Sequence, residues 1–78
     1  MRAQSEVEIR QNLAARISSL RREKGWTQQL LAGRSSLPRS YIADMEGGRR
    51  NPSLRSLLRV ANALGVPLNA LFSESNGG

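Results

Sequence analysis

The chain has 78 residues, enough for one small domain and too few for two. Its 12 Lys and Arg residues outnumber 6 Asp and Glu residues, and the net charge of +6 favours an acidic partner, nucleic acid or an anionic membrane. The absence of Cys and His excludes disulfides, a thiol nucleophile, an imidazole base and zinc sites built from those ligands. No apolar run exceeds three residues, so no membrane span or export signal is expected, and the sequence predicts a cytoplasmic protein.

The first helix is predicted over residues 6–24. Ser5 and Glu8 fit the capping box that starts helices, and Gly25 is suited to the left-handed conformation that ends them. Apolar residues recur at helical spacing between these signals, and they are Ile9, Leu13, Ile17 and Leu20. The chain ends, residues 1–4 and 74–78, are expected to be flexible, which leaves a folded domain over residues 5–73.

Four shorter helices are predicted after the first. Thr27 caps one over residues 28–35, with Trp26 before it in the core, and Pro38 separates it from the next, over residues 39–46. Ser53 caps the helix over residues 54–64, and Pro67 begins the last, over residues 67–72. The helix over residues 54–64 is expected to pack on the core through an apolar stripe, which consists of Leu54, Leu57, Leu58, Ala61 and Leu64. No segment alternates like a strand, so the prediction is an all-α, compact five-helix bundle.

Two short helices joined by a tight turn, over about residues 27–46, have the spacing of a helix-turn-helix. In that motif the second helix enters the major groove of DNA while the first crosses the phosphate backbone. The second helix must therefore bury apolar side chains on one face and present short polar or basic ones on the other. Its sequence does this, because Ile42 and Met45 can face inward while Arg39 and Ser40 face outward.

Five ordered segments extend this pattern over roughly residues 9–72. They are Leu20-Arg21-x-x-Lys24-Gly25-Trp26-Thr27-Gln28, Leu31-Ala32, Arg39-Ser40-Tyr41-Ile42-x-x-Met45-Glu46, Asn51-Pro52-Ser53-Leu54 and Ala63-Leu64-Gly65-Val66. On these residues the chain resembles the helix-turn-helix domain of phage repressors and Cro, the Xre-type regulators, which implies a lambda-repressor-like DNA-binding fold. The combination of Arg39-Ser40-Tyr41-Ile42 with Arg49-Arg50-Asn51 is also similar to the controller proteins of restriction–modification systems.

The resemblance implies a role for each matching position. The positions that meet base edges are Arg39, Ser40, Ala43 and Asp44. The positions that contact phosphate are Gln28, Thr27, Tyr41, Arg49, Arg50 and Asn51. Arg21 and Glu46 match an ion pair between the first and third helices. Asp44 places a negative charge on the DNA-facing side, where it either accepts a hydrogen bond from cytosine N4 or holds Arg39 or Arg49 in place.

Two residues depart from the family pattern at the turn. Pro38 stands where Ser or Thr usually caps the recognition helix, so it fits a helix start but offers no capping hydroxyl. Ser36 stands where Gly is common, which predicts mild backbone strain.

The sequence therefore predicts a sequence-specific regulator of transcription that binds double-stranded DNA as a homodimer on a palindromic or pseudopalindromic operator. The expected dimer surface is Val66, Leu68, Asn69 and Phe72. No cofactor, metal or small-molecule effector is expected. The alternative is a protein-interaction module, such as an antitoxin, on the same scaffold. An enzyme is disfavoured because the carboxylates show no paired arrangement, and a membrane-surface protein because the basic residues are not confined to the polar face of one amphipathic helix.

Overall fold

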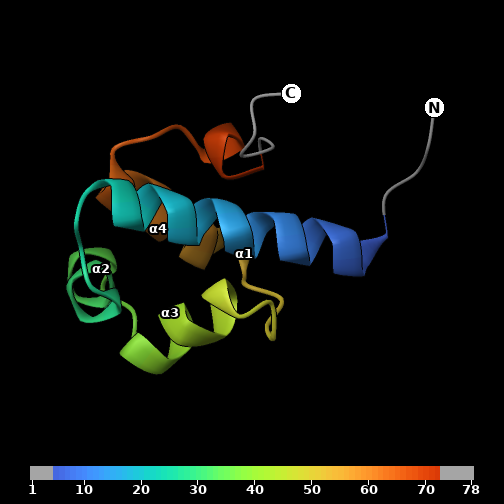
Figure 1. Cartoon of the computed structure of the whole chain (residues 1–78), viewed down its shortest axis with the longest axis horizontal. Coiled ribbons are helices and arrows are strands. Elements are labelled where there is room, and N and C mark those ends of the chain that lie inside the picture. The colour runs from blue at the N-terminus through green and yellow to red at the C-terminus, as the bar shows by residue number, and fades with distance from the viewer. Residues whose placement is uncertain (1–4, 73–78) are drawn as a thin grey trace.

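The fold consists of α-helices joined by short turns, as shown by a computed structural model that describes residues 5–72 (Figure 1). The predicted flexible ends, 1–4 and 74–78, lie outside the described residues. The elements are α1 (Glu6–Glu23), α2 (Gln28–Ser35), α3 (Arg39–Glu46), α4 (Leu54–Leu64) and the 3-10 helix η1 (Leu68–Phe72). Within the described part of the chain there is no strand and no helix long and apolar enough to cross a membrane.

The prediction of five α-helices is wrong in its last member. The segment after Pro67 turns with 3-10 geometry, in which the Ala70 N–H donates to the Pro67 carbonyl at 2.9 Å. This segment has only five residues, and the 3-10 helix is found mostly in such short pieces. The other four helices begin and end within one residue of their predicted bounds.

The long helix α1 crosses the molecule, with α2 and α3 below it in the view of Figure 1, α4 behind it and η1 above. α1 packs on α3 and η1, while α2 packs on α3 and α4. Every element contributes at least one fully buried apolar side chain to a single core. These side chains are Ile17, Leu31, Ile42, Val60, Leu64 and Leu71. The core therefore anchors the inner face of α3 and leaves its outer face exposed to solvent.

The predicted apolar stripe of α4 is wrong at two of its positions. Leu54 is 68% exposed and Leu58 48%, although both belong to the stripe that the sequence predicts to be buried. Ile9, the first member of the apolar series in α1, is 39% exposed. Leu54 and Ile9 lie in early turns that extend past the edge of the core, and Leu58 lies at the margin of the inward face of α4. Val60, which the predicted stripe omitted, is fully buried.

Local side-chain caps explain why the helix starts were predictable. Ser5 Oγ accepts a hydrogen bond from the Glu8 N–H at 3.1 Å, and Glu8 Oε1 accepts one from the Ser5 N–H at 3.3 Å, which completes the capping box. Thr27 Oγ1 accepts from the Leu30 N–H at 3.0 Å at the start of α2. Ser53 caps α4 in the same way.

The turn between α2 and α3 contains the strained residue that the sequence predicted. Ser36 ends α2 in the left-handed conformation, at φ 59° and ψ 37°, and is the only non-glycine residue with positive φ among residues 5–72. Pro38 starts α3 with no side-chain cap. The turn before α3 is therefore held by the backbone conformation of Ser36 and Pro38 and not by a side-chain cap on α3.

Replacing Ser36 with Gly should raise the free energy of unfolding by about 0.5–1 kcal/mol. The left-handed conformation costs an L-residue about 1–2 kcal/mol, and the greater freedom of glycine in the unfolded chain offsets part of the gain. Urea denaturation followed by circular dichroism measures the change. Gly65→Ser is the matched control, because Gly65 ends α4 at φ 73° and a Cβ there meets no atom within 4 Å. It should lose stability, and a Ser36→Gly variant less stable than wild type would contradict the strain.

Candidate nucleic-acid interface

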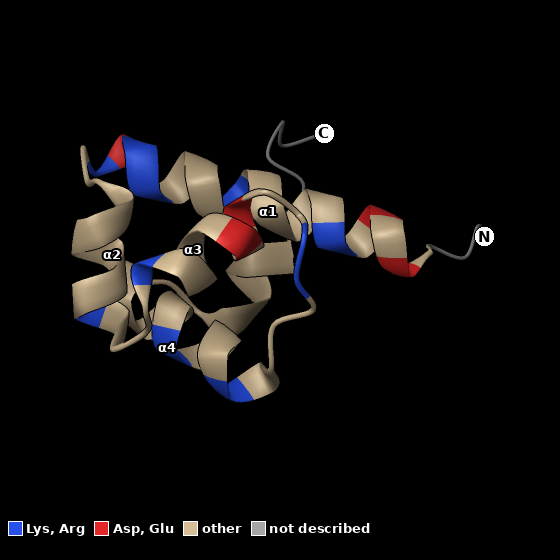
Figure 2. Cartoon of the chain, turned by 90° about the horizontal axis from the view of Figure 1, so that it is seen from below, with Lys and Arg blue, Asp and Glu red and all other residues tan. Residues whose placement is uncertain are grey.

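The helix α3 is anchored on one side and open on the other. Ile42 and Met45 are 0% and 2% exposed, so they fix the helix to the core. Arg39 and Ser40 are exposed in its first turn, while Ala43 is half-buried. Seen from below, α3 lies across the middle of the molecule with Lys and Arg residues on neighbouring elements around it (Figure 2). The exposed side of α3 is therefore a helical face of the kind that the major groove of DNA admits.

Tyr41 connects α3 to the loop that follows it. Its hydroxyl accepts a hydrogen bond from the Ser53 N–H at 3.2 Å, and the Arg50 guanidinium lies over its ring at 4.2 Å from the centroid. Burial raises the pKa of Tyr41, but hydrogen bonds from Ser56 and Ser53, together with the charge of Arg50, outweigh burial and leave the pKa below its ordinary value. Tyr41 therefore positions the basic loop against α3.

The loop arginines fold back on Asp44. Arg49 Nε lies 3.4 Å from Asp44 Oδ1, and Arg50 Nη2 lies 3.6 Å from Asp44 Oδ2. Arg49 Nη2 also donates a hydrogen bond to the Ala43 carbonyl at 3.1 Å. Asp44 therefore holds Arg49, which is one of the two roles expected for it. It also pairs with Arg50, which was not expected, and it does not pair with Arg39.

Asn51 is exposed, and its side-chain amide is hydrogen-bonded within the chain. Its Oδ1 accepts a hydrogen bond from Arg10 Nη1 at 3.0 Å, and its Nδ2 donates to Glu6. Both partners lie in the first turns of α1, so Asn51 links the end of the loop to the start of that helix. Arg10 had no predicted role. It lies 41 residues from Asn51, and no local sequence signal reports a pair at that separation.

Behind the exposed face, α1, α2 and α3 meet at a nearly buried ion pair. Arg21 and Glu46 form two parallel hydrogen bonds of 2.7 and 2.9 Å, and their side chains are 12% and 6% exposed. Arg21 also donates to the Trp26 carbonyl at 2.7 Å, and Gln28 Nε2 donates to Glu46 at 3.2 Å. The amide of Gln28 therefore braces α3, while the hydroxyl of Thr27 caps α2.

Charge and burial act in opposite directions on this pair. The hydrogen bond with Glu46 raises the pKa of Arg21 above its ordinary value. Burial raises the pKa of Glu46, but hydrogen bonds from Arg21 and Gln28 outweigh burial and hold this pKa below the ordinary value of 4.5. Both groups are therefore charged over the neutral pH range.

Trp26 packs against the core but is only partly buried. Lys24 Nζ lies 5.3 Å from its ring centroid and the Arg34 guanidinium 4.8 Å. The Trp26 ring therefore makes the core contact that the sequence predicted, and it also makes cation–π contacts with Lys24 and Arg34.

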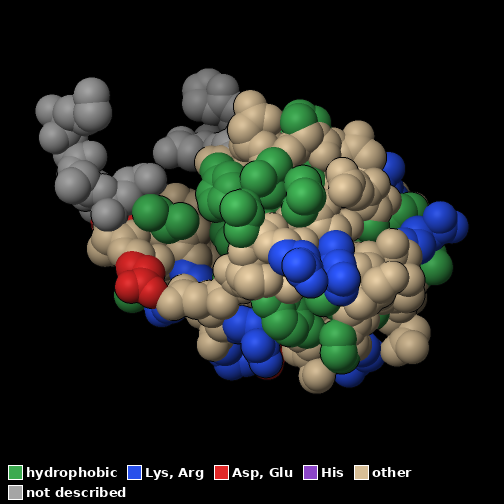
Figure 3. Space-filling model, turned by 180° about the vertical axis from the view of Figure 1, so that it is seen from behind, with side chains coloured by type: hydrophobic (Ala, Val, Ile, Leu, Met, Phe, Trp, Pro, Cys, Tyr) green, Lys and Arg blue, Asp and Glu red, His purple; other side chains and the backbone are tan. Residues whose placement is uncertain are grey.

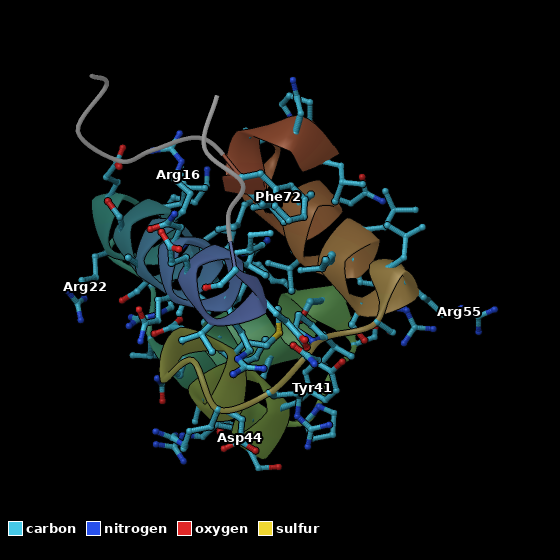
Figure 4. The ribbon with its side chains drawn as sticks, turned by 90° about the vertical axis from the view of Figure 1, so that its right-hand side faces the viewer. Arg16, Arg22, Tyr41, Asp44, Arg55 and Phe72 are labelled. Atoms are coloured by element: carbon cyan, nitrogen blue, oxygen red, sulfur yellow. The ribbon has the colours of Figure 1, made fainter. Side chains whose placement is uncertain are left out.

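The predicted dimer residues lie away from α3. Figure 4 shows Phe72 on the upper side of the molecule and Asp44 on the lower side. Val66 and Leu68 are half-buried and pack against the core of the same chain, whereas Asn69 and Phe72 are exposed. Only part of this predicted surface is therefore open to a partner.

An exposed helix that is followed by a basic loop and held by a preceding helix across a tight turn, in an all-helical domain, is characteristic of the helix-turn-helix class of DNA-binding proteins. The Helix-turn-helix family model matches residues 17–71, and the chain belongs to this family.

The relatives agree with the resemblance seen in the sequence. The immunity repressor protein of Bacillus phage phi105 is 48% identical over 59 residues, which are 76% of this chain and 41% of the repressor. The chain thus spans about two fifths of that relative. The crystal structure of the restriction-modification controller protein C.AhdI from Aeromonas hydrophila is 40% identical, with a TM-score of 0.79 over 81% of this chain and 96% of that chain.

A second controller protein, C.Esp1396I, has been solved as a tetramer in complex with its natural 35 base-pair operator. It is 33% identical to this chain, with a TM-score of 0.76 over 88% of each chain. The resemblance to phage repressors and to controller proteins is therefore confirmed.

Proposed function

We propose that this chain is a sequence-specific, double-stranded-DNA-binding regulator of transcription that works in the cytoplasm as a restriction–modification controller or phage-type repressor. The observation that carries this proposal is the position of α3. Ile42 and Met45 anchor it, Arg39 and Ser40 are exposed on its first turn, and a basic loop follows it. The controller-protein relatives share this fold and, in one case, bind an operator.

The exposed residues of α3 read bases in this proposal. Arg39 donates to guanine O6 and N7, and Ser40 contacts a neighbouring base edge. Ala43 is half-buried next to them and offers a methyl group for apolar contact with thymine. Arg49 and Arg50 contact phosphates, and Tyr41 supports them from beneath through its stack with Arg50.

Gln28 and Thr27 remain proposed phosphate contacts at the start of α2, where backbone N–H groups also favour an anion. Asn51 keeps its proposed contact only if the loop turns its amide from Glu6 and Arg10 toward DNA. Its present bonds instead support a positioning role for this residue.

A two-fold dimer would place two copies of α3 one helical turn of DNA apart, about 34 Å. Hydrophobic side chains gather on the face seen in Figure 3, and Phe72 is 47% exposed. Phe72 also lines an apolar groove of about 410 Å³ beside Ile9, Leu13 and Leu57. A second copy of this chain covering Phe72 would remove this apolar surface from water.

Replacing Phe72 with Asp should convert the dimer to a monomer at micromolar concentration, because a buried unpaired carboxylate is strongly unfavourable at an apolar interface. Sedimentation velocity would measure the mass, and operator affinity should fall by at least about a hundredfold because half of the contacts are lost. The matched control is Leu30→Asp, which alters another exposed apolar residue, on α2. Unchanged dimerisation of the Phe72 variant would place the interface elsewhere.

The decisive experiment is selection of bound duplexes from a random DNA library at about 150 mM salt. We expect a palindromic motif bound at least about a thousandfold more tightly than scrambled DNA. If the library yields no motif and binding is weak and salt-sensitive, the positive charge makes non-specific contacts only. That outcome would reject the proposal in favour of a protein-interaction module, such as an antitoxin.

A further inference from the structure

The strongest feature that the proposed function leaves unexplained is a negative charge on the DNA-facing side. Asp44 lies on α3, and both of its carboxylate oxygens face an arginine of the loop, at 3.4 Å for Arg49 and 3.6 Å for Arg50. Arg49 is held a second time by the Ala43 carbonyl. We call Asp44, Arg49 and Arg50 the Asp44 clamp.

Gly47 bears on the position of Arg49 in this arrangement. It has ordinary right-handed helical geometry, at φ −87°, so no backbone requirement calls for glycine there. A Cβ at this position would instead overlap the Arg49 guanidinium. The absence of a side chain at Gly47 therefore leaves the space in which Arg49 reaches back to Asp44.

We propose that the Asp44 clamp raises sequence specificity by weakening the binding of non-specific DNA. Non-specific affinity comes almost entirely from phosphates that replace counterions at Lys and Arg side chains. In the free protein Arg49 and Arg50 are paired with Asp44, so a phosphate must compete with that carboxylate for them. The charge of Asp44 also repels phosphates directly.

A correct operator offers the displaced carboxylate a new partner. When α3 lies in the major groove, Asp44 is on the side that meets base edges and can accept a hydrogen bond from cytosine N4. Non-specific DNA provides phosphates for the arginines but no placed donor for Asp44. Opening of the clamp is therefore favoured on the operator and disfavoured elsewhere. This inference rests on the proposed function for its operator half only.

The test measures the affinity for a scrambled duplex between 50 and about 200 mM salt, by fluorescence anisotropy. Asp44→Asn removes the carboxylate, and we expect binding about tenfold tighter, with a salt slope steeper by about one to two units because each added phosphate contact contributes about 0.9. Gly47→Ala displaces Arg49 without changing any charge, and it should shift affinity and slope in the same direction by about half as much.

Glu23→Gln is the matched control for the loss of one negative charge. Glu23 is exposed at the end of α1, and its carboxylate accepts a hydrogen bond from Ser19 at 3.4 Å. It should change affinity for the scrambled duplex by no more than about twofold, since one unpaired surface charge adds no phosphate contact. If Asp44→Asn matches this control in its affinity for the scrambled duplex and in its salt slope, the proposed role of the Asp44 clamp is rejected.

The operator measurement separates the clamp from the proposed function. On the selected operator we expect the ratio of specific to non-specific affinity to fall about tenfold in Asp44→Asn, and an unchanged or higher ratio would overturn the inference. If no operator emerges from selection, the proposed function fails, while the scrambled-duplex measurement still supports or overturns the clamp.

Discussion

Replacing Glu46 with Ala is expected to lower the free energy of unfolding by about 3–5 kcal/mol, because it leaves the Arg21 guanidinium nearly buried without its partner. Domains of this kind have about 5–15 kcal/mol in total, so the variant should be close to unfolding at 37 °C. Urea denaturation followed by far-UV circular dichroism measures the loss. The effect is large because Glu46 joins three helices through Arg21 and Gln28.

The control for this prediction replaces both charges together. Arg21→Met combined with Glu46→Leu removes the ion pair without leaving an uncompensated buried charge, so it should recover most of the lost stability. A Glu46→Ala variant that loses less than about 1 kcal/mol would show that water reaches the guanidinium and that the pair acts as a surface one.

The same pair predicts how stability depends on pH. Burial raises the pKa of Glu46, but the bonds from Arg21 and Gln28 bring the folded-state pKa below the ordinary value of 4.5. The stabilisation from ionised Glu46 is therefore complete above pH 4.5, and it is lost as pH falls through the lower folded-state value. Thermal melts between neutral pH and about pH 3 should show this loss in wild type, and a Glu46→Gln variant should lack this component.

Much of the fold could be predicted from sequence because its boundaries are local. Ser5, Thr27 and Ser53 each cap a helix through a hydrogen bond to a backbone N–H three residues ahead. Their signals lie within one turn and do not depend on the rest of the chain. The inward direction of Ile42 and Met45 follows from helical spacing in the same way.

The rest depends on where distant segments meet. The exposure of Leu54 and Leu58 follows from the position of the core's edge, which helical spacing does not report. The bonds of Asn51 to Glu6 and Arg10 cross more than forty residues. The partners of Asp44 are near in sequence, but spacing alone does not predict that the Arg49 side chain folds back over Gly47 to reach it.

The role of Arg39 leads to the second large effect. Its side chain is exposed in the first turn of α3 and has no hydrogen bond or ion pair with any residue in the described range 5–72. Replacing Arg39 with Ala should therefore leave the unfolding midpoint unchanged. Operator affinity should fall by about 1–3 kcal/mol, because a bidentate contact with guanine O6 and N7 is lost.

The loss should be confined to one base pair in each half-site. Competition with operators changed at single positions would measure it, and the variant should accept every base at the position that wild type reads as guanine. Arg22→Ala, which removes another exposed arginine, on α1 (Figure 4), is the control and should leave base preference unchanged. If Arg39→Ala instead weakened all duplexes equally and flattened the salt slope by about 0.9, Arg39 would be a phosphate contact. Base recognition would then pass to Ser40 and Asp44, the neighbours that remain on the exposed face of α3.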